Sequence, residues 1–352
     1  MAIRSAMGYS FINARIRGRK AKLLTAADYE TLLGTEDLDE MTRRLAETDY
    51  QPLFQEFANQ LDTLDNKLNQ TFFQEVQALA SYLPRSSAEF IRFYLQKYFY
   101  DGLKTIIRAL EVETPKEEIQ RLLIGTEEDL QKFQELMKAD SLSLMIEQIS
   151  DSTIREVLRE NLELAESFHS TVPLELAIDR WFYPTLWKES QRILKGTDLE
   201  RAQQFIGSLI DLINIQALLR IKRQFPAFDE GTIRNLLIPI NFRLHNVLER
   251  SLTAASPVEI FNYLLETAYR DFARLARESF EETGSLSELE MRVSGYLHYL
   301  AYKMLLGQPF NVGTFQAYLL LKNTEIQNLR AIAVGIAAGL DRDRIRQHIL
   351  IP

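Results

Sequence analysis

The sequence predicts an all-α protein made of three similar helical bundles, and three observations support this prediction. Glycine and proline are scarce, with 14 and 10 in 352 residues, whereas the two together make up about 12% of an average protein. No stretch alternates apolar and polar residues for long enough to form a β-strand. One arrangement of short capped helices followed by long apolar helices occurs three times along the chain.

The first predicted helix covers residues 9–24 and is strongly basic. Residues 1–22 contain six arginines and lysines and no acidic residue. We expect the basic face of this helix to meet an acidic partner or acids elsewhere in the chain. A transit peptide or a basic helix at a membrane surface are the alternatives.

A six-residue pattern then marks the short helices of each copy. Residues 45–50 and 264–269 both read L-x-E-T-x-Y, and residues 149–154 keep the order apolar, acid, hydroxyl, apolar, but end on Ile154. Glu40 and Glu259 stand three residues after the predicted N-cap residues of the first and third copies, and this spacing predicts capping boxes there. The predicted N-cap residues, eight positions before each leading apolar residue, are Asp37, Ser141 and Ser256.

Two long helices follow the short ones in each copy. Their connecting segments are so short that each pair must form an antiparallel hairpin. The predicted pairs are 52–82 with 87–112, 174–194 with 199–224, and 286–306 with 314–339. We therefore divide the chain into a first bundle at 1–115, a second at 116–228 and a third at 229–352.

A second landmark recurs in the last long helix of each copy. Asp101, Asn214 and Glu325 each stand one or two helical turns before an arginine, and apolar residues occupy one face between them. The three arginines, at spacings of about 110 residues, are Arg108, Arg220 and Arg330.

Composition excludes several classes of function. A net charge of −8 gives no general attraction to nucleic acid, and the absence of cysteine excludes disulfides and thiolate chemistry. The longest apolar run, 331–340, is half the length of a membrane span. Phosphate-binding loops and zinc-protease motifs are absent, and Glu166 with His169 forms only half of a di-iron motif. We therefore predict no cofactor, no metal and no enzymatic activity.

Aromatic residues cluster in two of the long helices, and at helical spacing we expect them to form bundle core rather than to stack nucleic-acid bases. They are Phe90, Phe93, Tyr94, Tyr98, Phe99 and Tyr100 in the first cluster, and Trp181, Phe182, Tyr183 and Trp187 in the second.

Three segments together resemble a known family. The opening Y-S-F-I-N-A-R-I-R at 9–17, the motif at 45–50 and the segment 325–330 are similar, in order and spacing, to the C subunit of the prokaryotic V-type (A/V-type) ATPases. The same family includes the d subunit of the eukaryotic vacuolar ATPases. The resemblance spans the whole chain, including its threefold helical plan.

The resemblance implies a funnel-shaped protein whose three bundles surround a central cavity in a pseudo-threefold arrangement. It implies a non-catalytic rotor adaptor that links the central-stalk subunits of the ATPase head to the proteolipid ring of the membrane sector. Such an adaptor transmits torque for proton or sodium transport. It lies on the cytoplasmic face of the membrane and is held there through the complex, without binding nucleic acid.

Five arginines are candidate partner contacts. The other interpretation is that they form structural ion pairs with acids such as Asp101 or Glu325. Two further readings of the whole chain remain open: a helical-repeat scaffold unrelated to rotary ATPases, and a helical-bundle metalloenzyme. The candidate contacts are Arg15, Arg19, Arg108, Arg220 and Arg330.

Overall fold

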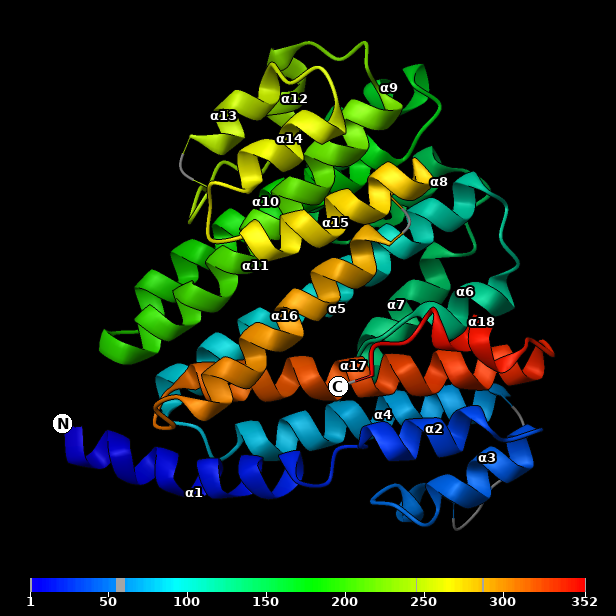
Figure 1. Cartoon of the computed structure of the whole chain (residues 1–352), viewed down its shortest axis with the longest axis vertical. Helices are drawn as coiled ribbons and strands as arrows, with labels where there is room; N and C mark the ends of the chain where they lie inside the picture. Colours follow the sequence, from blue (N-terminus) through cyan, green and yellow to red (C-terminus); the bar gives the residue numbers. More distant parts are fainter. Residues whose placement is uncertain (1, 55–60, 245, 287, 352) are drawn as a thin grey trace. The chain divides into compact units, whose positions relative to one another are not determined.

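The computed structural model describes the backbone of residues 2–54, 61–244, 246–286 and 288–351. Within these ranges the ordered elements are helices, and no residue lies in a β-strand. Figure 1 shows the course of the chain. The described residues form two compact units, the first from 1–88 together with 297–352 and the second from 89–296. The all-α prediction is confirmed.

The first unit is organised around one long, almost entirely buried helix, α17 (Val312–Ala337). Helix α4 (Leu61–Ala80) packs along it, and α1 (Ala2–Lys20) also contacts it (Figure 1). The short helices α2 (Ala26–Leu33), α3 (Leu38–Leu45) and α18 (Arg342–Arg346) complete the unit around α17, with a 3₁₀ turn at Gln51–Phe54.

The second unit is built from three long helices and several short ones. The long helices are α5 (Arg85–Glu111), α10 (Val172–Ile193) and α11 (Gly196–Gln224), and α10 packs on both α9 (Ser152–Ser167) and α11. The shorter helices are α6 (Lys116–Leu122), α7 (Glu127–Leu136), α8 (Leu142–Gln148), α12 (Glu230–Leu236), α13 (Val247–Leu252), α14 (Pro257–Leu264) and α15 (Arg270–Thr283). Helix α16 (Leu289–Leu306) begins in this unit and ends in the first.

The predicted long helices are found with boundaries shifted by a few residues, except at two helix starts. The helix predicted from residue 9 begins at Ala2 and ends at Lys20. The helix predicted from residue 52 starts instead with the 3₁₀ turn, residues 55–60 lie outside the described ranges, and α4 runs from Leu61. Pro52 lies inside this turn, where its missing amide hydrogen leaves no α-helical bond unmade.

The predicted N-caps are confirmed as positions, but the capping boxes differ from the prediction. Asp37 and Ser141 accept hydrogen bonds from the third amide of their helices, whereas Ser256 makes no side-chain cap. Glu40 accepts from the amide of Glu36, one residue before the cap. Glu259 binds the amide before its own cap residue in the same way. Each glutamate therefore binds the amide one residue before the N-cap, whereas in a capping box it would bind the amide of the N-cap residue itself.

Six of the ten clustered aromatic residues are buried in the core of the second unit, as predicted, and four are half-buried: Phe93, Phe99, Trp181 and Trp187. The rings of Phe93 and Phe182 are parallel with centroids 6.4 Å apart, and Tyr100 meets Phe182 at 4.9 Å. Tyr94 and Tyr183 are buried. These contacts connect α5 to α10 within the protein.

Helix α11 is long and apolar enough to cross a membrane by length and composition, although charged and polar residues interrupt its apolar stretches. Its most apolar stretch is 78% buried within the protein. Protein side chains therefore cover α11 where lipid would cover a membrane span.

Candidate functional site

The L-x-E-T-x-Y motif folds into the same local turn at both of its full occurrences. Thr48 donates its hydroxyl hydrogen to the carbonyl of Leu45 and accepts the amide of Tyr50, at 2.6 and 3.2 Å. Thr267 makes the same two bonds, to Leu264 and Tyr269, at 2.7 and 3.0 Å. The threonine thus ends the short helix and aims the tyrosine that follows.

In the first unit, the motif tyrosine reaches a buried carboxylate on α17. The Tyr50 hydroxyl donates to Glu325 Oε1 at 2.7 Å and accepts a hydrogen bond from Lys322 Nζ at 2.9 Å. Lys322 also binds Glu325 Oε1 at 2.8 Å, and Leu24 N donates to Glu325 Oε2 at 2.5 Å. Burial, reinforced by the Glu325 charge, raises the pKa of Tyr50 well above its usual value. The hydroxyl therefore stays a donor throughout the physiological range.

In the second unit, the other motif tyrosine reaches a buried carboxylate on α11. Tyr269 donates to Asp211 Oδ2 at 2.7 Å, and the amides of Phe242 and Arg243 donate to the same carboxylate at 3.0 and 2.7 Å. Burial raises the pKa of Asp211, although these three donors act in the opposite direction. We refer to Tyr50–Glu325 and Tyr269–Asp211 as the two tyrosine latches.

An asparagine one turn after each latch carboxylate binds a backbone segment. Asn214 donates to the carbonyl of Ile238 and accepts its amide, at 3.0 and 2.9 Å. Asn328 makes the same pair of bonds with Leu350, at 2.7 and 2.9 Å. Asn214 therefore corresponds to Asn328 and not to Glu325, so the alignment of these two helices predicted from the sequence is wrong by three residues.

Three of the residues in these networks were not singled out from the sequence: Lys322, Asp211 and Asn328. Lys322 and Asn328 belong to the largely polar segment 322–328, where nothing sets them apart from their neighbours. Asp211 is a charged side chain inside an otherwise apolar stretch of helix, and a buried charge of this kind requires a partner. That requirement was the available signal. Ile154, at the degenerate copy of the motif, is fully buried and has no hydroxyl to form a third latch.

Helices α5 and α10 are joined by a ladder of ion pairs. Lys104 Nζ lies 2.9 Å from Asp101 Oδ1 and 2.8 Å from Asp179 Oδ1, and Lys97 pairs with Asp101 one turn away. Burial alone would raise the pKa of Asp101, but Lys104 and Lys97 hold it well below its usual value. Burial alone would lower the pKa of Lys104, but Asp101 and Asp179 raise it, and the net effect is a pKa above the usual value. The two carboxylates, Asp101 and Asp179, are therefore balanced by two ammonium groups, those of Lys104 and Lys97.

Four of the five candidate arginines make ion pairs within the chain. Their acidic partners differ from Asp101 and Glu325, the two acids suggested by the sequence. Arg19 meets Asp49 and Glu75, each at 3.7 Å, Arg108 meets Glu175 at 3.5 Å, Arg220 meets Glu290 at 3.3 Å, and the buried Arg330 meets Asp65 at 3.5 Å.

Arg15, the fifth candidate, has a different environment. Its guanidinium lies over the rings of Phe11 and Tyr82. Among the described residues, no hydrogen bond or ion pair engages it. Arg15 therefore keeps its donors available.

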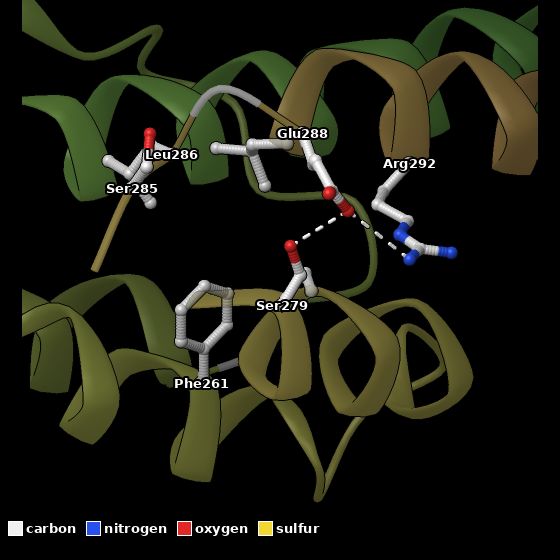
Figure 2. Close-up of a pocket in the computed structure, with 8 residues that line it drawn as sticks. Phe261, Ser279, Ser285, Leu286, Glu288 and Arg292 are labelled. Carbon is white, nitrogen blue, oxygen red and sulfur yellow. Dashed lines mark hydrogen bonds and ion pairs between the residues drawn. The ribbon is translucent and has the colours of Figure 1, made fainter. Parts of the chain in front are cut away.

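Two hollows differ in size. One of about 400 Å³ lies open to solvent, between residues 36–39 at the start of α3 and residues 336–337 at the end of α17. Figure 2 shows a pocket beside Phe261 in which Glu288 accepts a hydrogen bond from Ser279 at 2.8 Å and pairs with Arg292 at 3.4 Å. This pocket is too narrow to hold a water molecule. The described residues contain no group of three potential metal ligands. His169, half of the di-iron motif, is exposed at the end of α9 with a φ of 46°.

The ATP synthase (C/AC39) subunit family matches residues 12–348, nearly the whole chain. The chain belongs to this family. The resemblance seen in the sequence is therefore confirmed, and a scaffold unrelated to rotary ATPases is excluded.

Relatives in this family match over most of their length. The C subunit of the A-type ATP synthase of Haloferax volcanii is 27% identical, covering 97% of both chains. The protein of the same name from Halorubrum lacusprofundi is 28% identical over 99% of each, and that from Methanocaldococcus jannaschii is 25% identical over 97% of this chain and 86% of its own. Because coverage is nearly complete, the helices that hold the tyrosine latches lie inside the shared region.

Proposed function

We propose that this chain is a non-catalytic rotor adaptor that joins the central stalk of a rotary ATPase to its proteolipid ring and transmits torque between them. The observation that carries the proposal is the family match over residues 12–348. In this role the chain sits at the cytoplasmic face of the membrane, is held there by its partners, and hydrolyses no nucleotide.

A torque adaptor must resist bending and sliding of its helices, and the buried polar contacts support this requirement. The latches fix short helices to α17 and α11, and the Lys104 ladder fixes α5 to α10. Polar groups buried in hydrogen-bonded pairs tolerate only one register, since a shift by one helical turn leaves them without partners. Load applied to one helix is therefore passed to its neighbour.

We also propose that the three bundles surround a pseudo-threefold axis and form a funnel with a central cavity. The latches support this arrangement, because each joins the short helices of one predicted copy to the long helix of another. Tyr50 of the first copy binds the third, Tyr269 of the third binds the second, and Phe133 of the second stacks at 5.3 Å on Phe99 of the first. The three contacts therefore connect the copies in a closed ring, from the first to the third, from the third to the second, and from the second back to the first. A molecular envelope with three lobes is the expected result, and a solid globule would contradict it.

Co-purification tests the assignment to the complex. An affinity-tagged chain expressed in its native cells should bring down stalk and proteolipid subunits from gently solubilised membranes. Recovery of the tagged chain without either would contradict the proposal.

Rotation tests the adaptor role directly. The chain contains no cysteine, so a single introduced thiol is unique. Leu306, 80% exposed at the end of α16, is a suitable position. A probe attached to Leu306→Cys in the assembled complex should turn during ATP hydrolysis together with a probe on the proteolipid ring. A probe that stays still while the ring turns would place the chain in the stator.

A further inference from the structure

An arginine lies between two exposed aromatic rings on the surface of the first unit. The guanidinium carbon of Arg15 is 4.6 Å from the centroid of the Phe11 ring and 4.5 Å from that of Tyr82. The two rings are 4.8 Å apart and meet edge to face. Phe11 is 49% and Tyr82 39% exposed. The rings hold the guanidinium in one orientation, which reduces the conformational entropy lost on binding.

The two segments that form this surface contain no acidic residue. Helix α1 and the segment that carries Tyr82 lie within residues 1–27 and 76–88, and neither range contains an aspartate or glutamate, although the chain has 49. Seven arginines and lysines lie in the same two ranges. Among the described residues, no ion pair or hydrogen bond engages Arg15 or Arg17. The surface is therefore a local concentration of positive charge on an acidic protein.

The exposed face of α1 next to Arg15 carries two small residues. Phe11, Ala14, Arg15 and Gly18 follow one another at spacings of three, one and three residues, so they share one side of the helix. All four are exposed. A Cβ added at Gly18 would meet no atom within 4 Å. Small residues at this spacing let a second helix approach closely.

We propose that the Phe11–Arg15–Tyr82 surface docks an acidic α-helix of a neighbouring subunit. A carboxylate of that helix accepts two hydrogen bonds from the fork of Arg15, while its backbone packs on Ala14 and Gly18. Arginine and tyrosine are among the residue types that most often dominate binding energy at protein interfaces. The inference rests on the proposed function, since the neighbour is taken to be another member of the rotary complex.

A lipid surface fits the observations less well. Binding to anionic lipid is typical of clusters of about four to eight basic residues. On α1 and the residues that follow it, Arg19 and Lys22 already pair with Asp49. Lys20 lies over the ring of Tyr302, 4.9 Å from its centroid. Two of the seven basic residues are thus paired with an acid and a third is held against a ring, whereas a single bidentate carboxylate needs only the guanidinium that lies between Phe11 and Tyr82.

Rebinding to stripped membranes tests the proposal with a matched control. Arg17 is exposed on α1 and unpaired among the described residues, but lies about 200° around the helix from Arg15 at about 100° per residue. We expect Arg15→Glu to weaken rebinding of the full chain to membranes that lack it by about 30-fold, the effect of losing a dominant interface residue. Arg17→Glu makes the same charge change and should weaken rebinding by less than about threefold. Equal effects of the two variants would overturn the proposal.

Photo-crosslinking identifies the neighbour without changing Arg15. Ala14 replaced by benzoylphenylalanine in the assembled complex should crosslink to one neighbouring subunit, at a helical peptide that contains aspartate or glutamate. Crosslinks to lipid, or to a peptide without an acid, would overturn the proposal. Failure of the wild-type chain to rebind would contradict the proposed function itself. Wild-type rebinding matched by Arg15→Glu would contradict only the docking surface.

Discussion

Removing one hydroxyl from the first tyrosine latch should loosen the first unit by a measurable amount. Tyr50→Phe keeps the ring and deletes two hydrogen bonds, one to the Glu325 carboxylate at 2.7 Å and one from the Lys322 ammonium at 2.9 Å. Hydrogen bonds to charged groups are worth about 1.5–3 kcal/mol each. Because Glu325 keeps Lys322 and the Leu24 amide, the two losses do not add fully, and we expect a decrease of about 2–3 kcal/mol in the unit's free energy of unfolding.

Hydrogen exchange provides a local assay for this change. The Leu24 amide donates to Glu325, so the rate at which it exchanges reports how often the latch opens. A loss of about 2 kcal/mol corresponds to roughly 30-fold faster exchange. The exposed Tyr299 lies in the same unit, and Tyr299→Phe serves as the control with little expected effect. Unchanged exchange at Leu24 in Tyr50→Phe would refute the assignment of a stabilising latch.

Three further predictions concern other parts of the fold. Burial lowers the pKa of His298 from 6.5 to about 4, so the neutral ring contributes stability that is present above pH 6.5 and lost as the pH falls towards 4. Between pH 7 and 4.5 the loss is about 2 kcal/mol, denaturation at these two pH values measures it, and His298→Leu should abolish it. Gly102→Ala places a Cβ 2.4 Å from the buried Phe133 ring, and denaturant titration should show a loss of about 1–3 kcal/mol. Lys104→Met leaves Asp179 without its cation and should cost about 3–5 kcal/mol in the same titration.

Control substitutions show whether each loss of stability is specific to the site or would follow any substitution in the chain. Gly18→Ala lies in an open position of α1 and should stabilise the chain by about 1 kcal/mol. Lys132→Met removes an exposed ion pair with Glu128 and should cost less than about 1 kcal/mol. If Lys104→Met were no more harmful than Lys132→Met, the ladder between α5 and α10 would not be a source of stability. A stability curve of His298→Leu with the same acid sensitivity as the wild type would assign that sensitivity to another group.

The long helices were predictable because their apolar faces and short joints are local properties of the sequence. Five of the six long helices were anticipated in type and nearly in extent, from 85–111 to 312–337, whereas α4 begins at Leu61 and was predicted from residue 52. Helices α9 and α15 were not anticipated as separate elements, although both are amphipathic. The division into two compact units was also unforeseen, since it depends on contacts between residues far apart in the sequence, such as Tyr50 and Glu325.

The candidate contacts were less predictable than the fold. The sequence indicated that Tyr50, Tyr269 and Glu325 belong to recurring patterns, but the partner of each depends on tertiary packing. Recurrence of arginine suggested equivalent roles, yet Arg330 is buried against Asp65 while Arg108 is half exposed. A spacing in the sequence does not report whether a long side chain turns inward or outward. Among the five candidates, Arg15 alone lies in an environment that leaves its donors available to a partner, as far as the described residues show.

The first latch joins residues 275 positions apart. This separation sets how long Tyr50 must wait for Glu325 while the chain is being synthesised. Synthesis at about 5–20 residues per second leaves Tyr50 without its carboxylate for roughly 15–55 s. Residues 89–296 are complete before α17 exists, so they can fold while the first 88 residues wait. During that interval the apolar faces of α1 to α4 have no helix to cover them. The early helices are then the part of the nascent protein most exposed to chaperones and proteases.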